Sequence, residues 1–234
     1  MKKGLWLILM LVTMAASAQK DVTKFLGIPV DGSKAEMKRK LIDKGFTYNS
    51  QYDYFAGEFN GRDSHVYIAT NNNKVWRIMV CDANSCDETN IKIRFNNLCL
   101  QFAKNQKYVP TNMGEEDYTI SDKEDISYEM SVHNKRYQAS YYQISESPSI
   151  DTLAVYNRIQ TALLQKFTQE QIDNPTEKQQ EEITSIVQSE AIKYTIESME
   201  KKLVWFIISE ELYGDYSITL YYDNEYNHSD GEDL

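Results

Sequence analysis

The apolar and polar positions near the start of the chain predict a short helix. Ser33 and Glu36 have the S-x-x-E spacing of a capping box, in which each side chain reaches a free backbone N–H at the helix start. Met37 and Leu41 follow at helical spacing. The pattern therefore predicts an amphipathic helix over 34–44.

Three strand-like runs follow this helix. They read "YDYFAGEF", "HVYIAT" and "VWRIMVC", and the stretches "NGRDS" and "NNNK" separate them. Asn and Gly accept the positive φ angles that tight hairpin turns require. The runs therefore predict a three-stranded antiparallel meander.

A second, longer helix is predicted over 88–104. Ile91, Phe95, Leu98 and Phe102 fall on one face at helical spacing. The chain then becomes loop-like, because Pro and Gly interrupt any regular pattern.

Two hairpins are predicted in the second half of the chain. In "DISYEMSV" the residues Ile126, Tyr128, Met130 and Val132 alternate with polar ones, as in a half-buried strand, and "RYQASYYQIS" follows as its partner. "LVWFIIS" and "DYSITLYYD" form the last β region. Helices over 152–169 and 181–201 are expected between the two hairpins.

The grouping of helices and strands indicates an α+β fold. We expect an antiparallel sheet, built from the meander and two hairpins and covered by about four helices. The similar stretches "VWRIMV" and "VWFIIS" leave a duplicated helix-plus-meander unit open. We expect a single domain over 19–234, with a candidate sub-domain boundary near 108–117.

The first residues, 1–18, predict a secretory signal peptide. Two lysines precede an apolar stretch, and the small residues at 16–18 supply an A-x-A cleavage site. The apolar stretch is shorter than the roughly 20 residues that a membrane span needs, and no later stretch comes near that length. We therefore expect an exported chain, periplasmic or secreted, that has no membrane span and begins near Gln19.

Charge narrows the class of partner. The 234 residues include 25 Lys and Arg against 35 Asp and Glu, and the net charge of -10 becomes -12 when Lys2 and Lys3 leave with the signal peptide. No cluster of basic residues is present to neutralise phosphates. Nucleic acid is therefore not an expected partner.

Three cysteines leave two interpretations open. Cys81 and Cys86 are candidates for a disulfide that leaves Cys99 as a buried thiol, because an exported protein meets an oxidising environment. The alternative is that the cysteines are small buried hydrophobic residues. A metal site is not expected, since the Cys-x4-Cys pair has no neighbouring ligands to complete it.

Catalytic motifs are missing from the sequence. It has no nucleophile elbow, no metalloprotease helix, no phosphate-binding loop and no dinucleotide fingerprint. The sequence therefore points away from an enzyme and predicts no cofactor. The alternative is a secreted hydrolase whose acidic active site is assembled from carboxylates far apart in the chain.

The acidic tail "YYDNEYNHSDGEDL" contains candidate calcium ligands in Asp223, Glu225 and Asp230. An EF-hand is excluded, because the sixth position of the loop is not Gly and the twelfth is not Glu. The alternative is a solvated acidic terminus.

Seventeen tyrosines are the remaining signal for binding. Candidate ligand-binding residues are Tyr137, Tyr141, Tyr142, Tyr221 and Tyr226. Tyr rings offer large amphipathic contact area, which suits the recognition of a protein or a glycan. The alternative is ordinary strand packing. We expect a non-enzymatic binding protein.

Four stretches resemble a family of secreted proteins of unknown function from Gram-negative bacteria: "FLGIPVDGSKAEMKRKLIDKGF", "NNNKVWRIMVCDA", "IRFNNLCLQF" and "YYDNEYNHSDGEDL". This resemblance implies export, with no catalytic motif or assigned ligand. The element order over 33–81 is also similar to modules of the β-lactamase-inhibitor-protein fold. That likeness concerns fold alone, and it leaves an envelope-assembly or inhibitor module as a further alternative.

Overall fold

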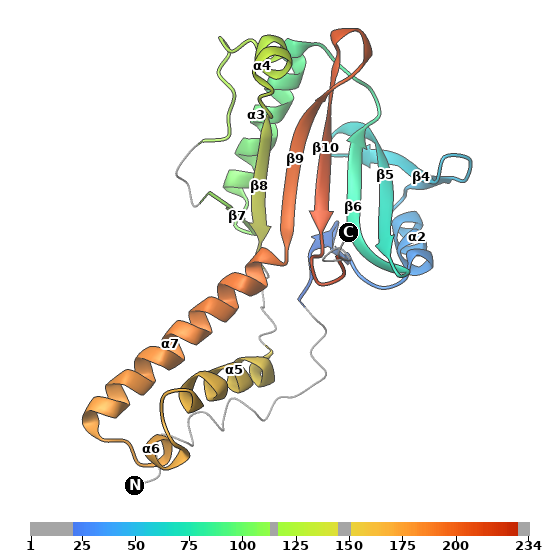
Figure 1. Ribbon diagram of the computed structural model, residues 1–234. Coiled ribbons are helices and arrows are strands. Elements are labelled where there is room, and N and C mark those ends of the chain that lie inside the picture. The colour runs from blue at the N-terminus through green and yellow to red at the C-terminus, as the bar shows by residue number, and fades with distance from the viewer. Residues whose placement is uncertain (1–20, 113–116, 145–150, 229–234) are drawn as a thin grey trace. The chain divides into compact units, whose positions relative to one another are not determined.

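The computed structural model describes residues 21–112, 117–144 and 151–228. In these ranges six α-helices, an eight-stranded antiparallel sheet and a two-stranded sheet confirm the predicted α+β class (Figure 1). The predicted signal peptide, 1–18, lies outside the described residues. The chain divides into a sheet unit, Val22–Glu146 with Met199–Leu234, and a helical unit that includes Ser147–Ser198.

The eight strands lie in the order β3-β4-β5-β6-β10-β9-β8-β7. Their bounds are β3 Thr47–Asn49, β4 Tyr54–Phe59, β5 Arg62–Asn71, β6 Lys74–Asp82, β7 Tyr108–Pro110, β8 Gln138–Gln143, β9 Leu203–Glu210 and β10 Tyr216–Asp223. At the centre β6 pairs with β10, with Cα partners Arg77 and Asp223 at one end and Cys81 and Thr219 at the other. Strands that lie far apart in the sequence therefore meet in the middle of the sheet. The candidate boundary near 108–117 falls inside the sheet unit.

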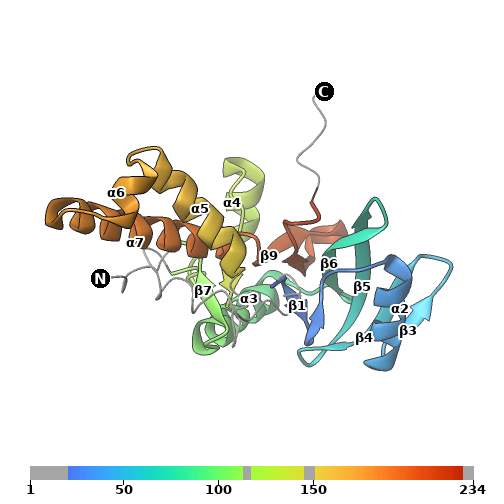
Figure 2. The same cartoon turned by 90° about the horizontal axis from the view of Figure 1, so that it is seen from below.

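Two helices cover one face of this sheet, α2 (Lys34–Asp43) and α3 (Glu88–Lys104) (Figures 1 and 2). The small hairpin of β1 (Lys24–Phe25) and β2 (Ile28–Pro29) contributes to the same core. Its Phe25 is fully buried, with its ring 5.0 Å from that of Tyr222 on β10. The core therefore lies between this face and the elements that cover it.

Both predicted helices of the first half are confirmed. The Ser33 hydroxyl accepts a hydrogen bond from the Glu36 N–H at 3.3 Å, and the Glu36 carboxylate accepts one from the Ser33 N–H at 2.9 Å, so the capping box is present. In α3 the predicted apolar face is buried.

The predicted strand at 125–132 is wrong, because this segment is the helix α4, Ile126–His133. The Asp125 side chain caps it by accepting the Tyr128 N–H at 2.9 Å, and Asn134 ends it in the left-handed region at φ 53°. Ile126 and Met130, one helical turn apart, face the core, whereas Tyr128 and Val132 are about half exposed. The hairpin predicted from this segment is therefore absent, and β8 pairs with β7 and β9 instead.

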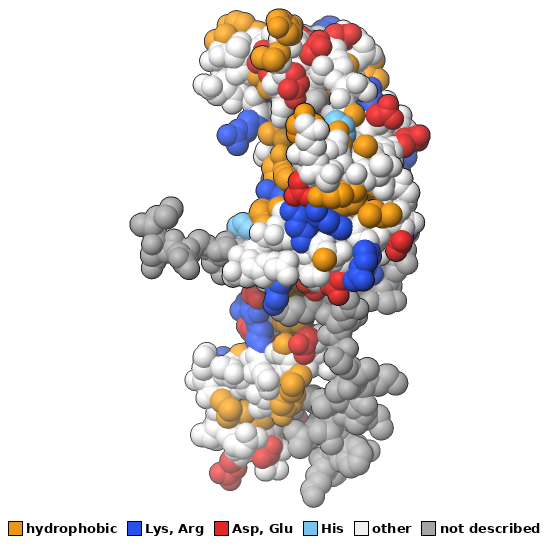
Figure 3. Space-filling view, turned by 90° about the vertical axis from the view of Figure 1, so that its right-hand side faces the viewer, with side chains coloured by type: hydrophobic (Ala, Val, Ile, Leu, Met, Phe, Trp, Pro, Cys, Tyr) orange, Lys and Arg blue, Asp and Glu red, His pale blue; other side chains and the backbone are white. Residues whose placement is uncertain are grey.

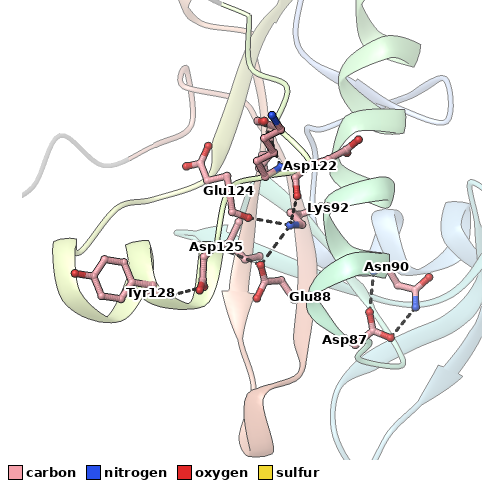
Figure 4. A network of polar contacts seen from close by, with 12 residues as sticks. Asp87, Glu88, Asn90, Lys92, Asp122, Glu124, Asp125 and Tyr128 are labelled. Atoms are coloured by element: carbon pink, nitrogen blue, oxygen red, sulfur yellow. Dashed lines mark hydrogen bonds and ion pairs between the residues drawn. The ribbon is translucent and has the colours of Figure 1, made fainter.

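A lysine on α3 holds the start of α4 in place (Figure 4). The Lys92 ammonium donates to the backbone carbonyls of Glu124, at 2.8 Å, and Asp122, at 3.2 Å, and pairs with the Glu88 carboxylate at 3.4 Å. The Glu88 carboxylate also accepts the Ile126 N–H at 3.1 Å. These long-range contacts favour the helix over the strand that the alternation predicts.

The helical unit contains α5 (Thr152–Leu164), α6 (Gln169–Asp173) and α7 (Glu177–Glu200). The helix predicted over 152–169 therefore ends earlier, and α7 begins earlier than the predicted 181. None of the helices in the described ranges is long and apolar enough to cross a membrane.

Ion pairs connect α5 to α7. The Arg158 guanidinium pairs with Glu190 at 2.7 Å and with Glu197 at 2.5 Å, and Lys166 pairs with Glu182 at 3.0 Å. Lys166 lies just beyond the end of α5, so ascending positions along α5 and the turn after it meet descending positions on α7, and the two helices are antiparallel. The unit is inserted between β8 and β9, which pair directly.

Candidate functional site

The face of the sheet opposite α2 and α3, the outer face, carries a row of large side chains. Tyr67 and Met79, Met79 and Tyr221, and Tyr221 and Trp205 are Cα partners on adjacent strands. The ring of Tyr54 lies 5.8 Å from that of Tyr67 and extends the row onto β4. All five side chains are partly exposed. We call these five residues the aromatic row.

A second row lies beside it on the same face. His65, Cys81, Thr219, Ile207 and Gln138 are successive Cα partners across β5, β6, β10, β9 and β8. Neither row contains Lys, Arg, Asp or Glu, although these residues make up 26% of the chain. Basic side chains gather instead near α2, on the side of the molecule that Figure 3 faces.

Next to the aromatic row, Arg77 and Asp223 form an ion pair. The Arg77 Nε and Nη2 donate to the two oxygens of Asp223 at 2.6 and 2.7 Å, and the Trp205 Nε1 donates to the same carboxylate at 2.9 Å. The Asp223 side chain is 1% exposed and that of Arg77 is 22% exposed. The pair therefore orients Trp205 and adds no net charge to this part of the face.

Aromatic rings on the outer face stack against neighbouring side chains. Trp205 and Tyr221 stack with centroids 4.0 Å apart and an interplanar angle of 11°. The Arg77 guanidinium lies 4.2 Å from the ring centre of Trp76 and 4.9 Å from that of Tyr221. Stacked rings of this kind turn their edges, rather than their broad faces, to a ligand.

Three side chains of the two rows, Tyr67, Tyr221 and Cys81, stay neutral near pH 7. Burial raises the pKa of the Tyr67 and Tyr221 hydroxyls and of the Cys81 thiol above their ordinary values. The tyrosine hydroxyls therefore remain hydrogen-bond donors. The outer face combines apolar area with neutral donors and acceptors.

The five candidate tyrosines lie in different places. Tyr142 and Tyr221 are partly exposed on the outer face, and Tyr226, beyond β10, is partly exposed as well. Tyr137 and Tyr141 are 5% and 2% exposed and lie in the core on the helix side. Alternation along β8 separates Tyr141 from Tyr142, because successive side chains point to opposite faces.

Sequence reasoning missed most of the aromatic row. Tyr67 lies between the buried residues Val66 and Ile68, and Trp205 lies between Val204 and Phe206. The alternation of side chains along each strand already indicated that Tyr67 and Trp205 point away from the core. The strand order that brings them together could not be read from the sequence.

The structure describes two of the three candidate calcium ligands, Asp223 and Glu225, and both have side-chain partners. The Asp223 carboxylate is engaged by Arg77 and Trp205, and a Glu225 oxygen lies 3.5 Å from the His228 Nδ1. Asp230 lies outside the described residues. Among the residues that the structure describes, no group of three or more His, Cys, Asp or Glu side chains could hold a metal ion.

The three cysteines are free thiols in the structure. Cys81 is on the outer face, where it accepts a hydrogen bond from the Thr219 hydroxyl at 3.5 Å, whereas Cys86 forms a backbone bridge to Tyr216. Cys99 is buried on α3, and burial raises its thiol pKa to about 12.

An acidic catalytic site would need a carboxyl group with a raised pKa to act as proton donor. In the described part of the chain, every carboxyl group with a clear shift has a lowered pKa. These groups are Glu36, Asp53, Asp87, Glu124, Glu190 and Glu197, and hydrogen bonds that stabilise the carboxylate are the main cause. This pattern lends no support to the hydrolase alternative.

Comparisons with known proteins assign no family. No protein-family model, curated protein sequence or solved structure matches this chain. The resemblances drawn from the sequence therefore stay predictions, and the candidate site rests on its geometry.

Proposed function

We propose that this chain is an exported, non-enzymatic binding protein whose outer face docks a partner protein. The observation that carries the proposal is the pair of uncharged rows, rich in Tyr, Trp and Met, in a chain that is otherwise a quarter charged. Centres of protein interfaces have this composition, depleted of charge and enriched in aromatic residues, Met and Arg. Arg77 adds a guanidinium held rigidly by Asp223.

A protein fits this face better than a glycan. Sugars stack on the broad, exposed face of an aromatic ring, whereas Trp205 and Tyr221 cover each other at 4.0 Å. The ring of Tyr54 is likewise 4.1 Å from that of His65. Ring edges and hydroxyls suit the varied apolar and polar contacts of a protein surface.

Site-specific photo-crosslinking tests the proposal. Ile207 and Tyr67 would each be replaced by benzoylphenylalanine in cells that produce the protein, with Ile93 and Tyr128 as controls. Both controls are about half exposed and lie on helices, away from the outer face. We expect one protein adduct of the same mass from both outer-face positions and none from the controls.

Removing a contact residue sharpens this test. Trp205→Ala should reduce the adduct formed from Tyr67, because interface centres depend on a few large aromatic side chains. An adduct of equal yield from the controls, or the absence of any adduct at the outer face, would contradict the proposal. The identity of the captured protein would separate an envelope-assembly role from an inhibitor role.

Export is part of the same proposal and has its own test. The proposed signal peptide predicts that the protein recovered from producing cells begins near Gln19 and lies outside the cytoplasm. A cytoplasmic protein that retains Met1 would contradict it.

We also propose that the sheet contains a duplicated unit, related in layout to modules of the β-lactamase-inhibitor-protein fold. In support, α2 is followed by β3 to β6 and α3 by β7 to β10, and the strand order is mirrored about the β6–β10 seam. "VWRIMV" is on the fourth strand of one half and "VWFIIS" on the third of the other, so these stretches are not equivalent. An experimental structure in which β6 fails to superpose on β10 when the halves are overlaid would refute the duplication.

A further inference from the structure

A groove lies on the helix side of the sheet unit, away from the outer face. It has a volume of about 330 Å³ and lies between α3, the β1–β2 turn and the β4–β5 turn. Four aromatic side chains line it, together with Leu98: Phe59, Phe102, Tyr108 and Tyr222. These five side chains belong to the hydrophobic core or pack against it.

One face of α3 forms the wall of this groove. Leu98, Gln101 and Phe102 follow at i, i+3 and i+4 along one stripe of the helix, and Asn105, the C-cap residue, comes directly after its last turn. Leu98 and Phe102 are buried, whereas Gln101 and Asn105 are exposed. The groove thus has an apolar floor and amide groups at its rim.

The β4–β5 turn adds a third amide, from Asn60, and the β1–β2 turn adds Leu26. Leu26 has a left-handed backbone with φ 50° and remains 41% exposed. This conformation is unfavourable for a side chain of that size. It keeps an apolar group exposed beside the aromatic floor.

Among the described residues that line the groove, charged side chains do not point into it. Glu58 is the acidic residue in its lining, but it follows Gly57 and precedes Phe59 on β4, and alternation turns its side chain to the opposite face. Burial raises the pKa of the Tyr108 and Tyr222 hydroxyls, so both are neutral. The Tyr108 hydroxyl accepts a hydrogen bond from the Gln143 amide at 3.2 Å.

We propose that this groove binds an uncharged small molecule that consists of one aromatic ring with a hydroxyl or amide substituent. A cavity of about 150 Å³ holds benzene, and ligand pockets begin at roughly 300 Å³, so the volume suits one substituted ring. Edge-to-face contacts with the aromatic floor favour a ring. The rim amides satisfy a neutral polar group, whereas a charged group would lose hydration without gaining a counter-ion.

Three probes that share a ring and differ in charge test the proposal: tyrosol, tyramine and 4-hydroxyphenylacetate. Binding to the full chain would be followed by NMR titration of the α3 amides. We expect tyrosol to bind in about the millimolar range or tighter, as a ligand of this size allows, and both charged probes to bind about ten-fold more weakly. Equal affinities for the three probes, or no binding of tyrosol, would overturn the proposal.

Two tryptophan variants locate the site. Gln101→Trp places a bulky ring at the rim from an exposed position, whereas Leu100→Trp places the same ring on a different face of α3, where Leu100 is 50% exposed. We expect about ten-fold weaker tyrosol binding for Gln101→Trp and unchanged binding for Leu100→Trp. Unchanged binding by Gln101→Trp would place the probe elsewhere and refute the assignment.

Discussion

Replacing Arg77 should destabilise the protein more than replacing its partner Asp223. In Arg77→Met the Asp223 carboxylate, 1% exposed, loses two charged hydrogen bonds and keeps only that from the Trp205 Nε1 among the side-chain donors described. A buried charge left without its partner costs about 3–5 kcal/mol. In Asp223→Asn the Arg77 side chain, 22% exposed, can turn its guanidinium to water. The free energy of unfolding should therefore fall by about 1.5–3 kcal/mol.

Urea unfolding followed by tryptophan fluorescence measures both losses, because Trp205 belongs to the network. Lys74→Met is the matched control: Lys74 is exposed on the same strand, and its replacement should change the free energy of unfolding by less than about 0.5 kcal/mol. If Arg77→Met were no more destabilising than Asp223→Asn, burial of the carboxylate would not govern this pair.

Three further outcomes are expected. Ser33→Ala should lower the free energy of unfolding by about 1 kcal/mol, measured in urea, because a first-turn N–H loses its acceptor; an unchanged midpoint would contradict the capping role. Hydrogen bonds from Lys34 and Lys38 hold the pKa of Asp53 well below its usual value. The ionised Asp53 carboxylate therefore stabilises the folded protein fully above about pH 4, and this stabilisation is lost as the pH falls toward the folded-state pKa. Asp53→Asn should therefore flatten the acid limb of stability against pH, and identical limbs would argue against this. Cys99, with a pKa of about 12, should escape iodoacetamide in the native protein at about pH 8 and react in urea, as mass spectrometry would show.

Local signals predicted the helices α2 and α3 well. The capping box at Ser33 fixed the start of α2, and the periodic stripe from Ile91 to Phe102 fixed α3, because in both cases the pattern and the local hydrogen bonds agree. The same logic failed at α4, where Tyr128 and Val132 alternate with polar residues and yet remain exposed. There the caps and the contacts from Lys92 decide the conformation.

The candidate site could be predicted only in part, because it depends on long-range strand pairing. Parity along each strand separates Tyr142 from Tyr141 and identifies Tyr67 and Trp205 as pointing away from the core. No local pattern, however, indicates that β10 inserts between β6 and β9, and that pairing is what joins Met79, Tyr221 and Trp205 into one row.

The position of the helical unit has a consequence for folding. Its two connections begin where the Gln143 N–H donates to the Lys202 carbonyl at 2.9 Å, so β8 and β9 find their register across one very long loop. Closing a loop becomes harder by about 0.6 kcal/mol for each doubling of its length. A turn of a few residues in place of 144–201 would therefore speed the pairing of these strands. The inserted helical unit thus slows the assembly of the sheet.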